Sequence, residues 1–226
     1  MRALVLAVLV ALPVLVALPM LALAEVPTDA KFQMARIRYS GGGDWYGDET
    51  SWINLMTGLS ERTTIASAKK EAVVSLRSND IFYYPFVTLT GHGTVTFSDD
   101  EAARLRAYLT GGGFLWIDDD YGLDQYIRPQ MKKVFPDKEF VELGPEHPVF
   151  HQVYELKDGI PKIHEHDGGP GHAFGIFHQG RLVCFYSWNT DIGDGLEDVE
   201  VHGDPPEKRE AALQMGINLV TYVLTH

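Results

Sequence analysis

The chain has 226 residues, a formal net charge of −12 at pH 7 and a single cysteine. An acidic chain is repelled by nucleic-acid phosphates and by anionic membrane surfaces, so we expect neither as a partner. One cysteine, Cys184, excludes an intramolecular disulfide. A chain of this length can bury enough apolar surface to fold without one.

The first residues of the chain predict export. Arg2 precedes an apolar stretch over residues 3–23 that ends in Ala22-Leu23-Ala24, the small-x-small pattern of a signal-peptidase site. An uncleaved membrane anchor is the alternative, because the stretch is nearly long enough to span a bilayer. Two prolines within the stretch favour cleavage. We therefore expect a signal peptide at residues 1–24 and a periplasmic or secreted protein that is not integral to the membrane after cleavage.

Strand and helix patterns alternate along residues 25–226, with no repeat or linker, so we expect a single domain there. Apolar and polar residues alternate over residues 32–39, as in a half-buried strand. A glycine-rich loop then leads into a helical pattern from about residue 50 to residue 62. Further strands are predicted at residues 73–76 and 85–90.

The next segment predicts a βαβ unit. Ser98, with Glu101 three residues later, forms a capping box that opens a helix running to about Leu109. Three glycines at residues 111–113 end this helix, with one of them at C′. A continuous apolar strand follows at residues 114–117, as expected for a strand covered on both faces. Strand, helix and strand in this order predict a sheet that is at least partly parallel.

The last third of the chain predicts a hairpin and a final helix. Two apolar strands, at residues 173–177 and 182–186, flank Gln179-Gly180, which indicates an antiparallel hairpin. Asp204 is expected to cap the final helix. The apolar positions that should dock this helix on the sheet are Leu213, Ile217, Val220 and Leu224. The expected fold is therefore an α/β three-layer sandwich, with a mostly parallel central sheet and an antiparallel hairpin.

The ends of the predicted strands collect acidic, aromatic and imidazole side chains. Open parallel sheets bind ligands beyond the carboxyl ends of their strands. We therefore expect a cleft at this edge. The candidate site residues are Asp44, Trp45, His92, Asp118, Asp119, Tyr121, Trp188, Asn189, Asp191 and Asp194.

The acidic and histidine clusters have two interpretations each. Neighbouring carboxylates at residues 118–120 repel one another, which either a ligand such as a divalent cation or the capping of the next helix would relieve. The spacing of acidic residues at 191, 194 and 197 suits calcium or a plain turn, and it lacks the EF-hand pattern. His164 and His166 would point the same way in an extended segment and bind zinc with a third ligand, but a glycine-rich loop follows them. We therefore predict no cofactor and leave a divalent metal open.

Nucleophilic catalysis has no motif in this sequence. Cys184 lies mid-strand at a buried position, so we interpret it as a core residue. There is no G-x-S-x-G elbow and no Walker-type or dinucleotide-binding glycine loop.

Several motifs, in this order, resemble the bacterial family called domain of unknown function 4159. They are RIRYS at residues 36–40, GDW at 43–45, YPF at 84–86, TGHG at 90–93, GGFLWIDD at 112–119, HPVF at 147–150 and NTDIGDG at 189–195. The resemblance extends from about Phe32 to the C-terminus. It implies a flavodoxin-like fold similar to class I glutamine amidotransferases and trehalose-utilisation (ThuA-like) proteins, and it implies no established activity.

The resemblance also implies what the protein does not do. Amidotransferases carry a cysteine nucleophile on the tight turn after a central strand. The corresponding turn here, after residues 114–117, carries Asp118, Asp119 and Asp120. We therefore expect no glutamine amidotransferase activity, because the thioester intermediate has no nucleophile.

We expect the cleft to bind a small polar, carbohydrate-like ligand or an envelope protein partner. The aromatic residues expected to stack on a sugar ring are Trp45, Tyr121 and Trp188, and the residues expected to bond its hydroxyls are Asp44, Asp119 and Asn189. The alternative is an envelope hydrolase that acts on a carbohydrate or peptide, with His92 and Asp119 as acid/base or metal-assisted groups. A structural role in a membrane complex is the third interpretation. The oligomeric state is not predicted.

Export predicts a new amino terminus. Mass spectrometry of protein recovered from the periplasm or medium should find Glu25, within about two residues, as the first residue. The full-length chain in the membrane fraction would instead show an uncleaved anchor.

Overall fold

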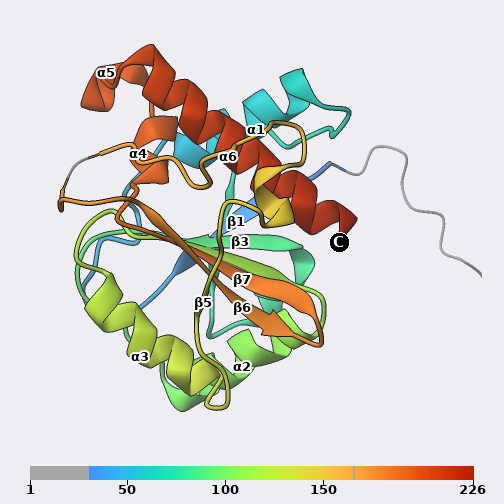
Figure 1. Ribbon diagram of the computed structural model, residues 1–226. Coiled ribbons are helices and arrows are strands. Elements are labelled where there is room, and N and C mark those ends of the chain that lie inside the picture. Colours follow the sequence, from blue (N-terminus) through green and yellow to red (C-terminus); the bar gives the residue numbers. More distant parts are fainter. Residues whose placement is uncertain (1–30, 165) are drawn as a thin grey trace, which may run out of the picture. The chain divides into compact units, whose positions relative to one another are not determined.

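A mixed β-sheet forms the centre of the fold (Figure 1). The structure, a computed structural model, describes residues 31–164 and 166–226, so the predicted signal peptide at residues 1–24 lies outside the described residues. Within the described residues, the sheet has seven strands in the order β2-β1-β3-β4-β7-β6-β5. Their bounds are β1 Met34–Arg38, β2 Ala72–Ser75, β3 Phe86–Leu89, β4 Phe114–Asp118, β5 Val141–Glu142, β6 His172–His178 and β7 Arg181–Trp188.

Helices cover both faces of this sheet (Figure 1). One face packs against α1 and α6, and α4 packs on both of these helices; α2 and α3 pack together on the other face. The bounds are α1 Ser51–Arg62, α2 Asp99–Thr110, α3 Asp124–Val134, α4 Ile192–Leu196, α5 Val199–His202 and α6 Pro206–Thr225, with short 3₁₀ helices η1 Asn79–Tyr83 and η2 Pro148–Phe150. The predicted α/β architecture of three layers is confirmed.

The strand directions also agree with the prediction. β2, β1, β3, β4 and β7 pair in parallel, whereas β6 pairs antiparallel with β7 and with β5. The order of the five parallel strands is that of flavodoxin-like folds. Gln179 and Gly180 turn the β6–β7 hairpin with φ angles of 50° and 82°, the left-handed values that a tight hairpin needs.

The continuously apolar sequence of β4 reflects burial of the strand on both faces. Leu115 and Ile117 lie in the core on the α2/α3 face, whereas Phe114 and Trp116 lie in the core on the α1/α6 face. Each of these side chains is fully buried, because helices cover the strand on both sides.

The predicted capping of α2 is confirmed. Ser98 Oγ accepts a hydrogen bond from the Glu101 N–H, and Glu101 Oε2 accepts one from the Ser98 N–H. At the other end Gly111 is the C-cap, and Gly112 follows with a φ of 115°. Glycine reaches this conformation without the steric cost of a Cβ.

Two predictions about α6 are wrong in detail. Pro205 is the N-cap, and Asp204 makes no capping bond, because it lies one residue too early and Pro206 has no N–H to donate. Leu224 is exposed, whereas Ile217 and Val220 are buried. The whole of α3 was not predicted, because its sequence is polar and contains Pro129. In the described part of the chain, no helix has the length and apolar content to cross a membrane.

The burial of Cys184 in β7 predicts that its thiol reacts slowly with thiol reagents in the native protein. Its side chain is fully buried, so native protein should react slowly with a thiol reagent and rapidly once denatured. Cys184→Ala should lower the free energy of unfolding by roughly 1 kcal/mol, since it removes one small buried group. Rapid modification of the native protein would contradict the assignment of this thiol to the core.

Candidate functional site

The loops that follow the parallel strands β1, β3, β4 and β7 all lie at the same edge of the sheet. β1 and β3 are neighbours, and their chains continue into helices on opposite faces. Loops that diverge in this way leave a crevice at the carboxyl ends of the strands, where flavodoxin-like folds bind ligands. The loops after β4 and β7 adjoin the same crevice.

Three buried aspartates, which we call the aspartate core, lie close together at this edge of the sheet. They are Asp48, Asp118 and Asp120, and each offers an oxygen within 4.8 Å of the others. Thr90 Oγ1 lies 2.8 Å from Asp48 Oδ2 and 2.5 Å from Asp120 Oδ1. The Ser187 hydroxyl donates to Asp118 Oδ1, and the Gly193 N–H donates to Asp118 Oδ2 at 2.5 Å.

The aspartate core favours neutral carboxyl groups. Burial raises the pKa of Asp118 to about 8. Burial, followed by the repulsion of neighbouring carboxylates, holds the pKa values of Asp48 and Asp120 well above their usual range. Asp118 therefore favours its protonated form at neutral pH, and ionising all three carboxyl groups together in a buried site is unfavourable.

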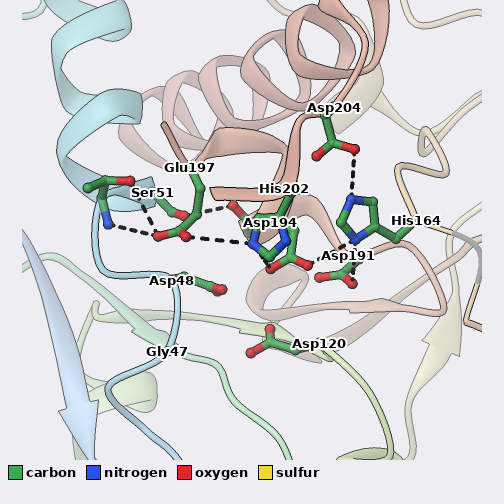
Figure 2. Close-up of polar contacts among 12 residues, drawn as sticks. Gly47, Asp48, Ser51, Asp120, His164, Asp191, Asp194, Glu197, His202 and Asp204 are labelled. Carbon is green, nitrogen blue, oxygen red and sulfur yellow. Dashed lines mark hydrogen bonds and ion pairs between the residues drawn. The ribbon is translucent and has the colours of Figure 1, made fainter. Parts of the chain in front are cut away.

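A second group, which we call the histidine–aspartate cluster, lies beside the aspartate core (Figure 2). It consists of His164, His166, Asp191 and Asp194, whose donor atoms lie within 4.8 Å of one another. His164 Nδ1 lies 2.9 Å from Asp194 Oδ2 and 3.4 Å from Asp191 Oδ2. His166 Nε2 lies 2.5 Å from the same Asp191 oxygen.

The loop after β7 has an unusual backbone. Asn189 and Asp191 have φ angles of 57° and 61°, a left-handed conformation that Asn and Asp tolerate better than most residues. A Cβ at Gly193 would lie 2.2 Å from Asp48 Oδ2, so only glycine lets this loop approach the aspartate core. These residues bring Asp191 and Asp194 towards the sheet.

His92 forms a pair with Asp44 at the outer side of the crevice. His92 Nδ1 lies 3.1 Å from Asp44 Oδ2 and 3.9 Å from Asp120 Oδ2. The imidazole is half-exposed. Gly91 makes the turn with a φ of 125°, and a Cβ there would lie 2.6 Å from Tyr39 Oη.

Asp119 makes its contacts elsewhere. Asp119 Oδ1 accepts from the Leu123 N–H at 2.8 Å, in the turn before α3, and Oδ2 accepts from Tyr186 Oη at 3.3 Å. Burial raises the pKa of Asp119 to about 6. The polar contacts of His92 are thus with Asp44 and Asp120, and those of Asp119 serve the start of α3.

A cleft of about 200 Å³ is lined by the loops after β4 and β7 and by the segment before β6. Its lining includes four of the candidate site residues, Asp119, Tyr121, Trp188 and Asn189, together with Asp120 and His166. Asp44 and His92 are not part of this lining. Trp45 lines a separate hollow with Arg36.

The sequence profile of a domain of unknown function (DUF4159) matches residues 33–224. The chain belongs to this family. The resemblance found in the sequence is therefore confirmed at the level of the family. No curated protein matches the chain.

Four residues of this site were not among the sequence candidates: Asp48, Asp120, His164 and His166. Asp48 and Asp120 belong to the aspartate core, and His166 lines the cleft. In the sequence Asp120 is only the last residue of an aspartate run at residues 118–120, and Asp48 has no signal beyond its place after a glycine-rich loop. The sequence did indicate that His164 and His166 can face one way, but it gave no third ligand for them.

The raised pKa of Asp119 predicts how the stability of the DUF4159 domain depends on pH. Because the folded-state value is about 6 against an ordinary 3.8, the neutral carboxyl stabilises the fold below pH 4, and this contribution is lost as the pH rises through 6. Asn keeps the acceptor for Leu123 and stays neutral. Asp119→Asn should therefore raise the free energy of unfolding at pH 7 by about 1 to 3 kcal/mol relative to its effect at pH 4.

Chemical denaturation at both pH values, with chelator present, measures this difference. The control is Asp137→Asn, because the side chain of Asp137 is 64% exposed. The same pH-dependent gain in both variants would show that Asp119 ionises as an ordinary surface acid.

Proposed function

We propose that this is an exported cell-envelope protein that binds a small polar, carbohydrate-like ligand in the cleft at the carboxyl edge of its sheet. One observation supports this proposal above the others. Tyr121 and Trp188 line the same small cleft as Asp119, Asp120 and Asn189. Aromatic faces beside carboxylate and amide groups match the apolar faces and hydroxyls of a sugar ring.

The size of the cleft favours a ligand of about one sugar unit. Its volume of about 200 Å³ is below the roughly 300–1,000 Å³ of pockets that hold drug-sized molecules. Tyr121 is 49% exposed, so its ring can be covered by a ligand. This ring also lies 5.0 Å from that of His166, which limits how far it can move.

The sequence predicts that Asn189 bonds ligand hydroxyls, whereas in this proposal it positions a neighbouring loop. Its Nδ2 donates to the Pro170 carbonyl at 3.0 Å, and its Oδ1 accepts from Lys162 Nζ at 3.2 Å. These bonds hold the loop at residues 168–170 beside the cleft. We infer that Asn189 positions this loop, and that Asp119 and Asp120 supply acceptors for ligand hydroxyls.

We further propose kinship with the class I amidotransferase-like and ThuA-like folds, on the strand order and the sharp turn after β4. That turn begins at Asp118 and continues through Asp119 and Asp120, where an amidotransferase has its cysteine. Cys184 is buried in β7. Amidotransferase chemistry is therefore not part of the proposed function.

The second candidate function is an envelope hydrolase acting on a carbohydrate or peptide. The observation that favours it is the His92–Asp44 pair, with Asp120 Oδ2 at 3.9 Å from the imidazole. A carboxylate that orients a half-exposed imidazole is a common general-base arrangement. In this version Asp44 and Asp120 act with His92, in place of Asp119.

Calorimetric titration with a panel of mono- and disaccharides tests the binding function. Trp188→Ala and Tyr121→Ala should each weaken binding by about tenfold, because each removes a stacking face. Tyr83→Ala is the control, since Tyr83 is 82% exposed and is not part of the cleft lining. Equal loss in all three variants, or no saccharide binding by the wild type, would refute the proposal. Turnover of a bound saccharide that His92→Asn abolishes would favour the hydrolase.

A further inference from the structure

The histidine–aspartate cluster has a donor set that suits a metal ion. Two imidazoles come from the segment before β6, one carboxylate from the loop after β7 and one from α4. His164 and His166 both approach the same oxygen of Asp191. We propose that His164, His166, Asp191 and Asp194 bind one divalent transition-metal ion of the zinc type. This inference goes beyond the proposed saccharide binding and does not depend on it.

The donor atoms of the cluster lie close together, one pair already has the spacing of zinc ligands, and the 2.5 Å between His166 Nε2 and Asp191 Oδ2 would lengthen on binding. Nitrogen and oxygen ligands bind zinc at about 2.0–2.2 Å, so neighbouring ligand atoms of a tetrahedral site lie about 3.3–3.5 Å apart. His164 Nδ1 lies 3.4 Å from Asp191 Oδ2 and 2.9 Å from Asp194 Oδ2. Small side-chain shifts are enough to admit an ion among these atoms.

The ring of His164 is already oriented as a ligand. Its Nε2 lies 2.7 Å from Asp204 Oδ1, while its Nδ1 faces the cluster (Figure 2). Metal-binding histidines usually donate their other ring N–H to a carboxylate, which fixes the tautomer and the ring orientation. Asp204 is buried, so its contact with His164 is shielded from water.

The carboxylates are also held in place, and one has an unused oxygen. Asp194 Oδ1 lies 3.2 Å from His202 Nε2, leaving Oδ2 towards His164. Asp191 is 1% exposed, and its Oδ1 is buried without a hydrogen-bond partner. A buried carboxylate oxygen without a donor is costly unless a cation or proton satisfies it.

The surrounding charge favours a cation. Across the described residues, no lysine or arginine forms an ion pair with Asp191, Asp194 or the aspartate core. The histidines alone face these acids. A divalent ion would therefore offset the charge of Asp191 and Asp194, whose ion-pair partners in the described part of the chain are histidines.

The ligand types select the class of metal. Imidazole nitrogens suit zinc and its neighbours in the first transition series, whereas magnesium and calcium prefer oxygen ligands throughout. The aspartate core is not included in this site, because it offers carboxylate oxygens and no imidazole, although Asp120 Oδ2 is also buried without a hydrogen-bond partner. His166 lines the cleft, so the ion would lie at the cleft wall.

Zinc uptake by purified, tag-free protein tests the proposal. After treatment with a chelator and its removal, the protein should take up one Zn²⁺ per chain, measured by elemental analysis and by competition with a zinc-binding dye. Replacing the zinc by Co²⁺ should give the visible absorption of a four-coordinate ion. Mg²⁺ and Ca²⁺ should not compete at equal concentration.

Three variants assign the zinc to this cluster. His164→Gln and Asp191→Asn should each weaken Zn²⁺ binding by at least tenfold, and Asn suits the left-handed backbone at position 191. Asp204→Ala should weaken it about 10- to 100-fold by releasing the His164 ring. The matched control is His151→Gln, because His151 is also paired with a carboxylate, that of Glu155 at 2.8 Å, but lies outside the cluster. Circular dichroism establishes that each variant is folded.

Three outcomes would overturn the proposal: a wild-type chain that takes up no stoichiometric zinc, variants that bind zinc as the wild type does, or a preference for Mg²⁺ or Ca²⁺. Trp188→Ala separates this test from that of saccharide binding, because it should retain zinc whether or not the saccharide binds. If Asp191→Asn is unfolded, Asp204→Ala and the cobalt spectrum of the wild type decide the matter.

Discussion

The hydroxyl of Thr90 joins two buried carboxyl groups, and the carboxyl edge of the sheet depends on this arrangement. Its oxygen lies within hydrogen-bond distance of both Asp48 and Asp120, yet a hydroxyl carries only one proton. If both contacts are hydrogen bonds, one carboxyl group must supply the other proton. The high pKa values of the two aspartates follow from the same burial. The Thr90 hydroxyl thus links the loops after β1, β3 and β4.

The loop after β7 is attached to this assembly through backbone groups. The Gly193 N–H binds Asp118, and the Gly193 carbonyl accepts from the Ser51 hydroxyl at the start of α1. The loop therefore cannot move away from the sheet without breaking buried hydrogen bonds. Asp191, at the end of this loop, and Asp194, in α4, are therefore held in place before any ligand binds. Sites supported in this way lose less entropy when a ligand or ion binds.

The sequence predicted the fold well because its signals are local. The Ser98–Glu101 capping box, the apolar run of β4 and the Gln179-Gly180 turn each specify a structure within a few residues. The site was predicted less completely, because its contacts are long-range. Asp204 follows the local pattern of a helix cap, but its partner His164 is 40 residues away. Asp48 enters the site only through tertiary contacts with Thr90 and with the loop that carries Gly193.

The outer strands of the sheet have a consequence for how copies of this chain meet. β5 consists of only Val141 and Glu142, so this edge offers very few unpaired backbone groups to a neighbouring strand. At the opposite edge, exposed Lys69 and Lys70 lie just before β2, separated from it by Glu71. Short edge strands and lysines are two means by which proteins prevent their sheets from joining edge to edge. The protein can therefore be concentrated in a crowded compartment without its sheet serving as a template for aggregation.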